Sequence, residues 1–166
     1  QIPANEGDNS LHGGANGLSQ QFYDVTTSQD QEKLQVILTT TIGTAVDQLP
    51  GNETIKITYT LDNDNGVTID FDGQTDAKTL FNPTTHAYWN LSGEAKTIQG
   101  HVLTLNSTYH LELDDEKIPT GRKLSNKNTP FDFSHPTVMG TALQEMQEQH
   151  VPEGGFDDIF VVLPSN

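Results

Sequence analysis

The 166-residue chain contains no cysteine, so disulfide bonds and thiol chemistry are both excluded. Basic residues are also scarce: 8 lysines and arginines stand against 23 acidic residues, and the formal net charge is −15. A surface of this charge repels phosphate backbones and anionic lipid headgroups, which argues against nucleic acid and membrane partners. No apolar run approaches the roughly 18 residues that span a bilayer. No signal-peptide pattern opens the chain, so we expect a cytoplasmic location.

Motifs of several enzyme classes are missing as well. The chain has no GxSxG, Walker or GxGxxG sequence, which excludes the usual serine hydrolases and nucleotide-binding proteins. Its 6 histidines are scattered, with no pair at helical metal-ligand spacing. We therefore expect no metal site.

Alternation of apolar and polar residues is the main pattern present, and this period of two is typical of half-buried strands. It predicts strands at Leu34–Thr39, Thr54–Leu61 and Val67–Asp72. Asn65 and Gly66 tolerate positive φ angles and predict a tight turn that joins the last two strands in an antiparallel hairpin. Further strands are expected at Gln21–Thr27, His101–Asn106 and Asp158–Leu163.

Helix signals are confined to one segment. Thr141–Gln149 contains helix formers throughout, but its apolar residues Leu143 and Met146 predict no more than a short surface turn. Many strands, frequent turn signals and almost no helix together predict an all-β fold, a large antiparallel β-sandwich. No shift in composition marks a linker, so residues 1–166 are expected to form a single domain.

One segment, Pro83–Gly93, combines a histidine with aromatic and amide side chains. Histidine gives and takes a proton near neutral pH with little tuning. Aromatic faces and amides around it suit a sugar, which offers C–H faces and hydroxyl groups. The combination is compatible with acid–base chemistry on a carbohydrate at His86, but a single histidine in a polar loop does not by itself indicate catalysis.

Four stretches of the chain form an ordered set of motifs. They are Asn9–Gly14 with its lead-in Pro3–Gly7, then Pro83–Gly93, then Ile118–Gly121 with Thr129–Phe133, and finally Gly155–Phe160. These stretches, in this order, resemble the aldose 1-epimerases (galactose mutarotases). The resemblance extends over essentially the whole chain and implies a galactose-mutarotase-like supersandwich, of which residues 1–166 form the central part, incomplete at both ends.

The resemblance also implies roles for three residues in the interconversion of the α and β anomers of hexoses such as galactose and glucose. His86 would be the general acid that protonates the ring oxygen, and His12 would hydrogen-bond the substrate and its transition state. Asp157 would bind sugar hydroxyls. No metal or organic cofactor is expected, because the reaction consists of proton transfer and bond rotation.

Two parts of the family's site have no counterpart in these residues: the glutamate that acts as general base, and an arginine that contacts the sugar. We therefore expect the chain to be nearly inactive by itself and to associate with the remainder of its own domain. Two alternatives stay open. The first is a non-catalytic sugar-binding or regulatory relative, and the second is an epimerase of phosphorylated hexoses, which would need additional basic residues in the motifs.

Other polar and aromatic residues have simpler interpretations. Tyr88 and Trp89 are expected to be core or half-buried packing residues rather than to contact a sugar. Asp132 is expected to cap a strand or turn. Four histidines outside the matched positions are expected to be structural or exposed: His101, His110, His135 and His150.

Overall fold

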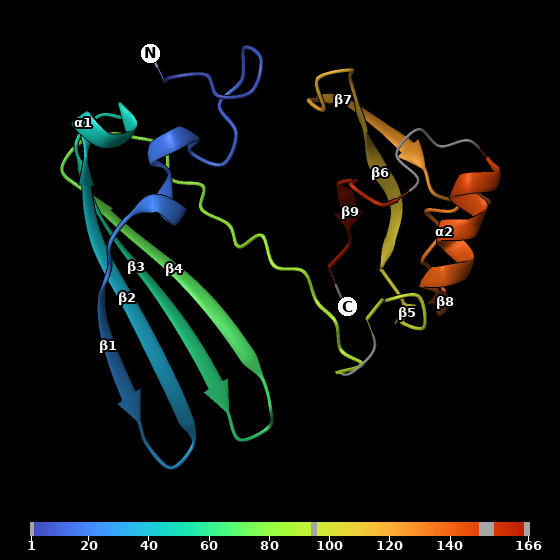
Figure 1. Cartoon of the computed structure of the whole chain (residues 1–166), viewed down its shortest axis with the longest axis horizontal. Helices are drawn as coiled ribbons and strands as arrows, with labels where there is room; N and C mark the ends of the chain where they lie inside the picture. Colours follow the sequence, from blue (N-terminus) through green and yellow to red (C-terminus); the bar gives the residue numbers. More distant parts are fainter. Residues whose placement is uncertain (1, 94–95, 150–154, 165–166) are drawn as a thin grey trace. The chain divides into compact units, whose positions relative to one another are not determined.

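The computed structural model describes residues 2–93, 96–149 and 155–164 (Figure 1). The chain divides into two compact units, Gln1–Thr85 and His86–Asn166. The strands of both units pair antiparallel, and the described residues contain few helices, so the all-β antiparallel prediction is confirmed. The prediction that residues 1–166 form a single domain stays a prediction. No helix in the described part of the chain is long and apolar enough to cross a membrane.

The first unit is built on a four-stranded antiparallel meander in the order β1-β2-β3-β4 (Figure 1). Two short 3-10 helices, η1 and η2, precede the sheet, and a single helical turn, α1, connects β2 to β3. All strands predicted in this region are present, and most are longer than predicted. The bounds are η1 Gly14–Asn16, η2 Leu18–Gln20, β1 Asp24–Gln29, β2 Lys33–Gly43, α1 Thr44–Asp47, β3 Asn52–Asp62 and β4 Val67–Thr75.

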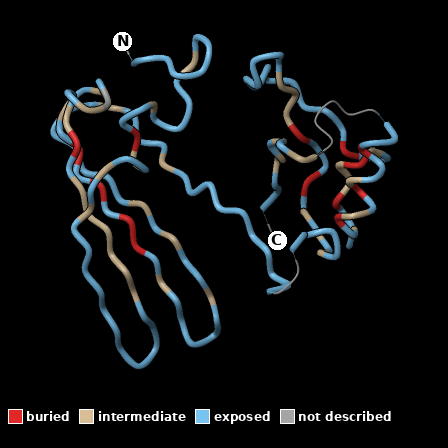
Figure 2. Tube along the Cα trace, in the orientation of Figure 1, coloured by how far each residue is buried: buried red, intermediate tan, exposed pale blue. Residues whose placement is uncertain are grey.

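The apolar residues of the alternating pattern share one face of this sheet. The register pairs Leu38 with Ile57 and Ile57 with Phe71, and directly paired residues point to the same side. Ile42, Ile55 and Ile57 are buried at one end of this face, where Leu18 and Tyr23 pack against them. Figure 2 shows the buried residues confined to that end of the strands. The core of the first unit therefore covers only part of the apolar face.

The hairpin between β3 and β4 closes as the sequence predicts. Asn65 has a φ of 63°, in the left-handed region that asparagine tolerates. The carboxylate of Asp62 accepts the backbone N–H groups of Asp64 and Gly66 at 3.0 and 2.7 Å. These bonds fix the turn and hence the register of the two strands.

The second unit contains two small antiparallel sheets and one helix. One sheet pairs β5 with β8, and the other has the order β7-β6-β9. Strands are present within the predicted segments at His101–Asn106 and Asp158–Leu163, whereas β6, β7 and β8 were not predicted. The bounds are β5 Val102–Leu103, β6 Ser107–Leu113, β7 Pro119–Ser125, β8 Thr137–Val138, α2 Met139–Glu148 and β9 Phe160–Val162.

The prediction of a short surface turn at Thr141–Gln149 is wrong. The segment belongs to α2, a ten-residue helix that buries Met139, Ala142 and Met146. These positions are three and four residues apart and therefore form one apolar stripe. The pattern Leu143–Met146 missed this stripe because it left out Met139 and the small residue Ala142.

Candidate functional site

His86 lies in the irregular segment between β4 and β5 and is exposed. Its ring faces that of Tyr88, with the ring centroids 5.2 Å apart and the planes inclined by 31°. The side chains of Tyr88 and Trp89 are 89% and 62% exposed, so the expectation that they are core or half-buried packing residues is wrong. The segment presents an imidazole and two aromatic side chains to solvent, and these groups suit the C–H faces and hydroxyl groups of a sugar.

Residues beyond His86 are held by side-chain bonds to the backbone. The N–H of Leu91 donates to Nε2 of His101 at 2.8 Å. The N–H and the hydroxyl of Ser92 both donate to Oδ1 of Asn90, at 3.2 and 2.7 Å. The motif thus ends in a defined turn, although it contains no helix or strand.

His12 occupies a tight turn in the first unit. Its φ of 53° is positive, and so are those of Gly13 and Gly14, at 81° and 70°. Asn5 clamps the preceding residue, because its side chain accepts the Leu11 N–H at 2.7 Å and donates to the Leu11 carbonyl at 3.1 Å. The two glycines have a conformational role, since positive φ is costly for other residues.

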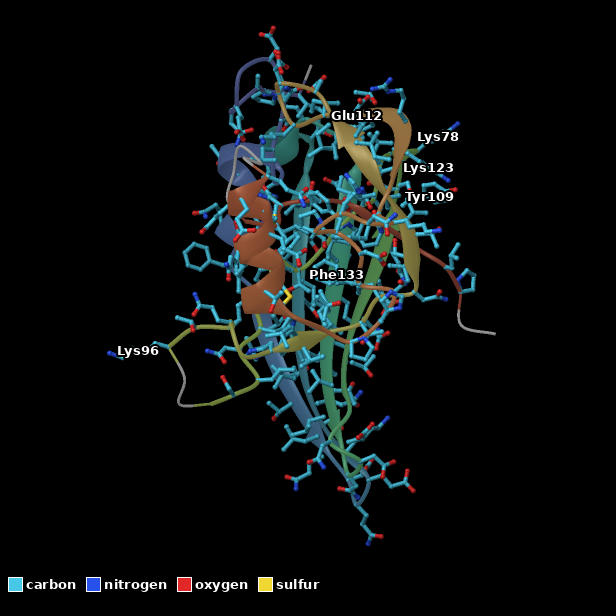
Figure 3. All side chains as sticks on the ribbon, turned by 90° about the vertical axis from the view of Figure 1, so that its right-hand side faces the viewer. Lys78, Lys96, Tyr109, Glu112, Lys123 and Phe133 are labelled. Atoms are coloured by element: carbon cyan, nitrogen blue, oxygen red, sulfur yellow. The ribbon has the colours of Figure 1, made fainter. Side chains whose placement is uncertain are left out.

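Asp157 lies between α2 and β9 and is exposed, with its own N–H 3.2 Å from a carboxylate oxygen of Asp158. The residue before it, Phe156, is anchored by edge-to-face contacts with Phe131 and Phe133, at centroid distances of 5.6 and 5.1 Å. Two stretches of the matched pattern therefore meet through buried or half-buried aromatic rings. Figure 3 shows the side chains of the chain, with Phe133 labelled.

His110 is a buried residue whose importance the sequence did not indicate. Its ring stacks on Phe131 with centroids 4.4 Å apart, and its Nδ1 lies 2.8 Å from Oδ1 of Asn126. Asn126 also donates to the carbonyl of Ser107 at 3.2 Å. The expectation that His110 is structural is confirmed, and the buried pair links β6 to the segment that follows β7. His150 lies outside the described residues.

Asp132 caps a turn, as expected. Its Oδ1 accepts the hydroxyl of Ser134 at 2.6 Å and the Ser134 N–H at 3.2 Å. The donated hydroxyl holds the pKa of the Asp132 carboxyl below its usual value. A carboxylate occupied in this way is a structural acceptor and not a free proton acceptor.

A cavity of about 390 Å³ in the second unit lies beside the β6 and β7 strands. Neither His86 nor Asp157 lines it. Its lining includes Asp132, which caps a turn, and Asn126, whose side chain is buried. The complete lining is Ser107, Thr108, Tyr109, Ser125, Asn126, Lys127, Asn128, Asp132, Ser134 and His135.

The three predicted site residues are thus all exposed, and they divide between the units: His12 belongs to the first, and His86 and Asp157 to the second. Each lies on an irregular segment whose backbone is fixed by glycines, amide clamps or aromatic packing. The roles predicted for the three residues stay predictions.

Comparison with known proteins identifies the family. A profile described as "Aldose 1-epimerase" matches residues 1–165. The chain belongs to the aldose 1-epimerase family. It is 40% identical to the maltose epimerase of Levilactobacillus brevis over 99% of this chain and 48% of that protein. It is 38% identical to the aldose 1-epimerase of Streptococcus thermophilus, over 97% of this chain and 44% of that protein.

A solved structure of the same family confirms the fold. The galactose 1-epimerase from Lactobacillus acidophilus NCFM aligns with a TM-score of 0.84 and 30% identity, covering 100% of this chain and 49% of that chain. The prediction of a galactose-mutarotase-like fold is therefore confirmed. The chain spans about half the length of the curated relatives it matches.

Proposed function

We propose that this chain carries the acid side of an aldose 1-epimerase site, which interconverts the α and β anomers of a hexose. His86 protonates the ring oxygen, His12 hydrogen-bonds the substrate and its transition state, and Asp157 binds sugar hydroxyls. The observation that carries the proposal is the family match over residues 1–165, which includes all three residues. The exposed imidazole of His86 beside the Tyr88 ring supports it, because a proton donor must reach the substrate.

The chemistry explains why an acid alone is insufficient. Ring opening breaks the bond between C1 and the ring oxygen, and the oxygen takes a proton from the acid while the C1 hydroxyl loses its proton to a base. The open aldehyde turns about the C1–C2 bond and recloses on its other face, with the two groups exchanging roles. Each positioned acid or base contributes about 10²- to 10⁴-fold in rate. A chain with His86 but without its base is therefore expected to be slow.

The names of the relatives suggest which sugars to test as substrates of this chain. The matched relatives are named for maltose, galactose and aldoses in general. We take a neutral hexose as the substrate and include a disaccharide with a hexose reducing end among the compounds to be tested. A phosphorylated hexose is disfavoured because none of the matched stretches contains a lysine or arginine that could bind the phosphate.

Polarimetry tests the proposal. Freshly dissolved α-D-galactose, α-D-glucose and α-maltose are followed towards anomeric equilibrium with the 166-residue chain and with the complete polypeptide that its gene encodes. We expect acceleration by the complete polypeptide that is lost in His86→Ala and retained in His135→Ala. His135 is a matched control because it is an exposed histidine outside the predicted site.

The outcomes separate the two classes of function. Loss of acceleration in His86→Ala, with sugar binding retained, assigns the acid role to His86. Sugar binding without any acceleration by the complete polypeptide would overturn the enzyme proposal and leave a sugar-binding relative. Full acceleration by His86→Ala would remove His86 from the mechanism.

We propose further that this chain associates with the remainder of its own domain, and that the protein is cytoplasmic. The uncovered end of the apolar sheet face supports the first point: Leu34, Leu61 and Val67, which pair in one row, are 44%, 48% and 57% exposed. Exposed apolar faces of this kind mark interaction surfaces. A stable folded monomer of 18.2 kDa in solution would contradict the need for such a partner.

A further inference from the structure

His101 has no role in the function proposed above, yet its side chain reaches the segment that carries His86. The N–H of Leu91 donates to its Nε2 at 2.8 Å. Leu91 lies five residues after His86, within the same irregular segment and beyond both exposed aromatic residues. No strand ladder is available to this segment, so each side-chain bond contributes a large share of its order.

The backbone of His101 is itself well anchored. Its carbonyl accepts the Met139 N–H at 2.8 Å, at the start of α2. The next residue, Val102, pairs with Val138 in the β5–β8 sheet. One residue on from Met139, the N–H of Gly140 donates to the carbonyl of Gln99 at 2.9 Å, so the turn before His101 is tied to the helix as well.

The helix side of this anchor is part of the core. Met139 is buried and packs with Phe133 and Ala142. The imidazole of His101 therefore connects a rigid element to a segment that lacks regular structure. The connection requires that Nε2 accept a hydrogen bond, which only a neutral imidazole protonated at Nδ1 can do.

We infer that His101 is a positioning residue for the proposed acid: it holds the Tyr88–Leu91 part of the segment and thereby fixes the approach of His86 to the sugar. The inference rests on the proposed function of His86. A displacement of about 1 Å in a reacting group lowers rates substantially, so one bond that orders the segment affects turnover without contacting the substrate. His101 acts through the backbone of Leu91 and does not donate or accept the reaction's protons.

Two substitutions distinguish this role from simple packing. His101→Leu keeps an apolar side chain of moderate size and removes the acceptor. His101→Gln restores an acceptor, because its side-chain oxygen extends to nearly the place of Nε2. His135→Leu is the matched control for loss of an imidazole elsewhere in the second unit.

Amide hydrogen exchange measures the bond, and kinetics measures its consequence. In His101→Leu we expect the Leu91 amide to exchange about 5- to 10-fold faster, which corresponds to the loss of one hydrogen bond. For the complete polypeptide we expect kcat to fall by a similar factor while KM stays within about twofold, because the bond acts on orientation in the transition state. His101→Gln should recover most of both losses, and His135→Leu should show neither.

A measurement on the unsubstituted protein keeps the inference testable if His101→Leu fails to fold. A scalar coupling between the Leu91 amide nitrogen and Nε2 of His101, seen by NMR, would demonstrate the bond. Absence of this coupling, or unchanged Leu91 exchange in a folded His101→Leu, would overturn the inference. Faster exchange with unchanged kcat would overturn it too, provided that His86→Ala lowers kcat. Unchanged kcat in His86→Ala would instead overturn the proposed function.

Discussion

Replacing Phe133 by leucine tests the idea that aromatic packing positions the Asp157 segment. Phe133 is 1% exposed, and its ring lies 5.1 Å from Phe156 and 5.7 Å from Phe160 between centroids. Leucine keeps most of the apolar volume but loses both aromatic pairs, each of which contributes about 0.5–1.5 kcal/mol. The second unit should therefore lose about 2 kcal/mol of stability, which raises the population of its open form about 30-fold.

Hydrogen exchange followed by mass spectrometry measures this loss separately in each unit. Peptides from α2 and β6 should exchange about 30-fold faster in Phe133→Leu, because their protection depends on opening of the second unit. Peptides from β3 in the first unit serve as the internal reference and should not change.

Phe22→Leu is the matched control, since the side chain of Phe22 is 95% exposed and its replacement should change stability by less than about 0.5 kcal/mol. Wild-type exchange of α2 and β6 in Phe133→Leu would refute the reasoning. Equal effects of the two substitutions would refute it as well.

Two further predictions concern the first unit. Asn5→Ala removes both bonds to Leu11, so the Leu11 amide should exchange about 5- to 10-fold faster and the His12 turn should loosen; unchanged exchange in NMR would contradict the clamp. The second prediction concerns Asp76, whose pKa is lowered from 3.8 by hydrogen bonds from the backbone N–H of Asn52 and then from its side-chain amide. These bonds stabilise the folded state above pH 3.8, and this stabilisation is lost as the pH falls through the lower pKa of the folded state. Asp76→Asn should therefore lower the unfolding free energy near neutral pH, and its difference from the wild type should shrink in acid; a pH-independent difference in urea titrations would argue against this linkage.

The alternating sheet of the first unit was predictable because its apolar residues share one face. Ile55 and Ile57 are buried, whereas Lys56 between them is exposed and forms an ion pair with Asp72 at 3.0 Å on the other face. A period of two therefore appears directly in the sequence. The hairpin turn was predictable for a different reason, because Asn65 tolerates the positive φ that the turn requires.

Strand β6 of the second unit was not predicted because its buried residues are polar. In β6 both Ser107 and His110 are buried. The Ser107 hydroxyl donates to the carbonyls of Tyr109 and Val161, each at 2.8 Å, so its burial costs little. These partners lie 2 and 54 residues away, and the distant one cannot be read from a local pattern. β7 is exposed along its whole length and therefore has no apolar alternation to detect.

The candidate site residues came from motif resemblance, whereas the groups that hold them came only from the structure. Nothing in the sequence indicates that Asn5 clamps Leu11 or that His101 accepts the Leu91 N–H. Both bonds join a side chain to a backbone group, and backbone donors and acceptors occur at almost every residue. Residue identity therefore carries little information about such pairs.

The last matched motif combines an exposed polar residue with a packed aromatic residue, and the structure gives a physical reason for this combination. Asp157 is exposed, but its neighbour Phe156 packs against Phe131 and Phe133 from another matched stretch. Exposed side chains on irregular segments have few contacts of their own, so their positions depend on buried neighbours that have many. A functional residue in such a segment therefore requires an anchor one or two positions away. This requirement explains why aromatic residues that are not expected to touch a sugar belong to the same motif as the carboxylate expected to bind it.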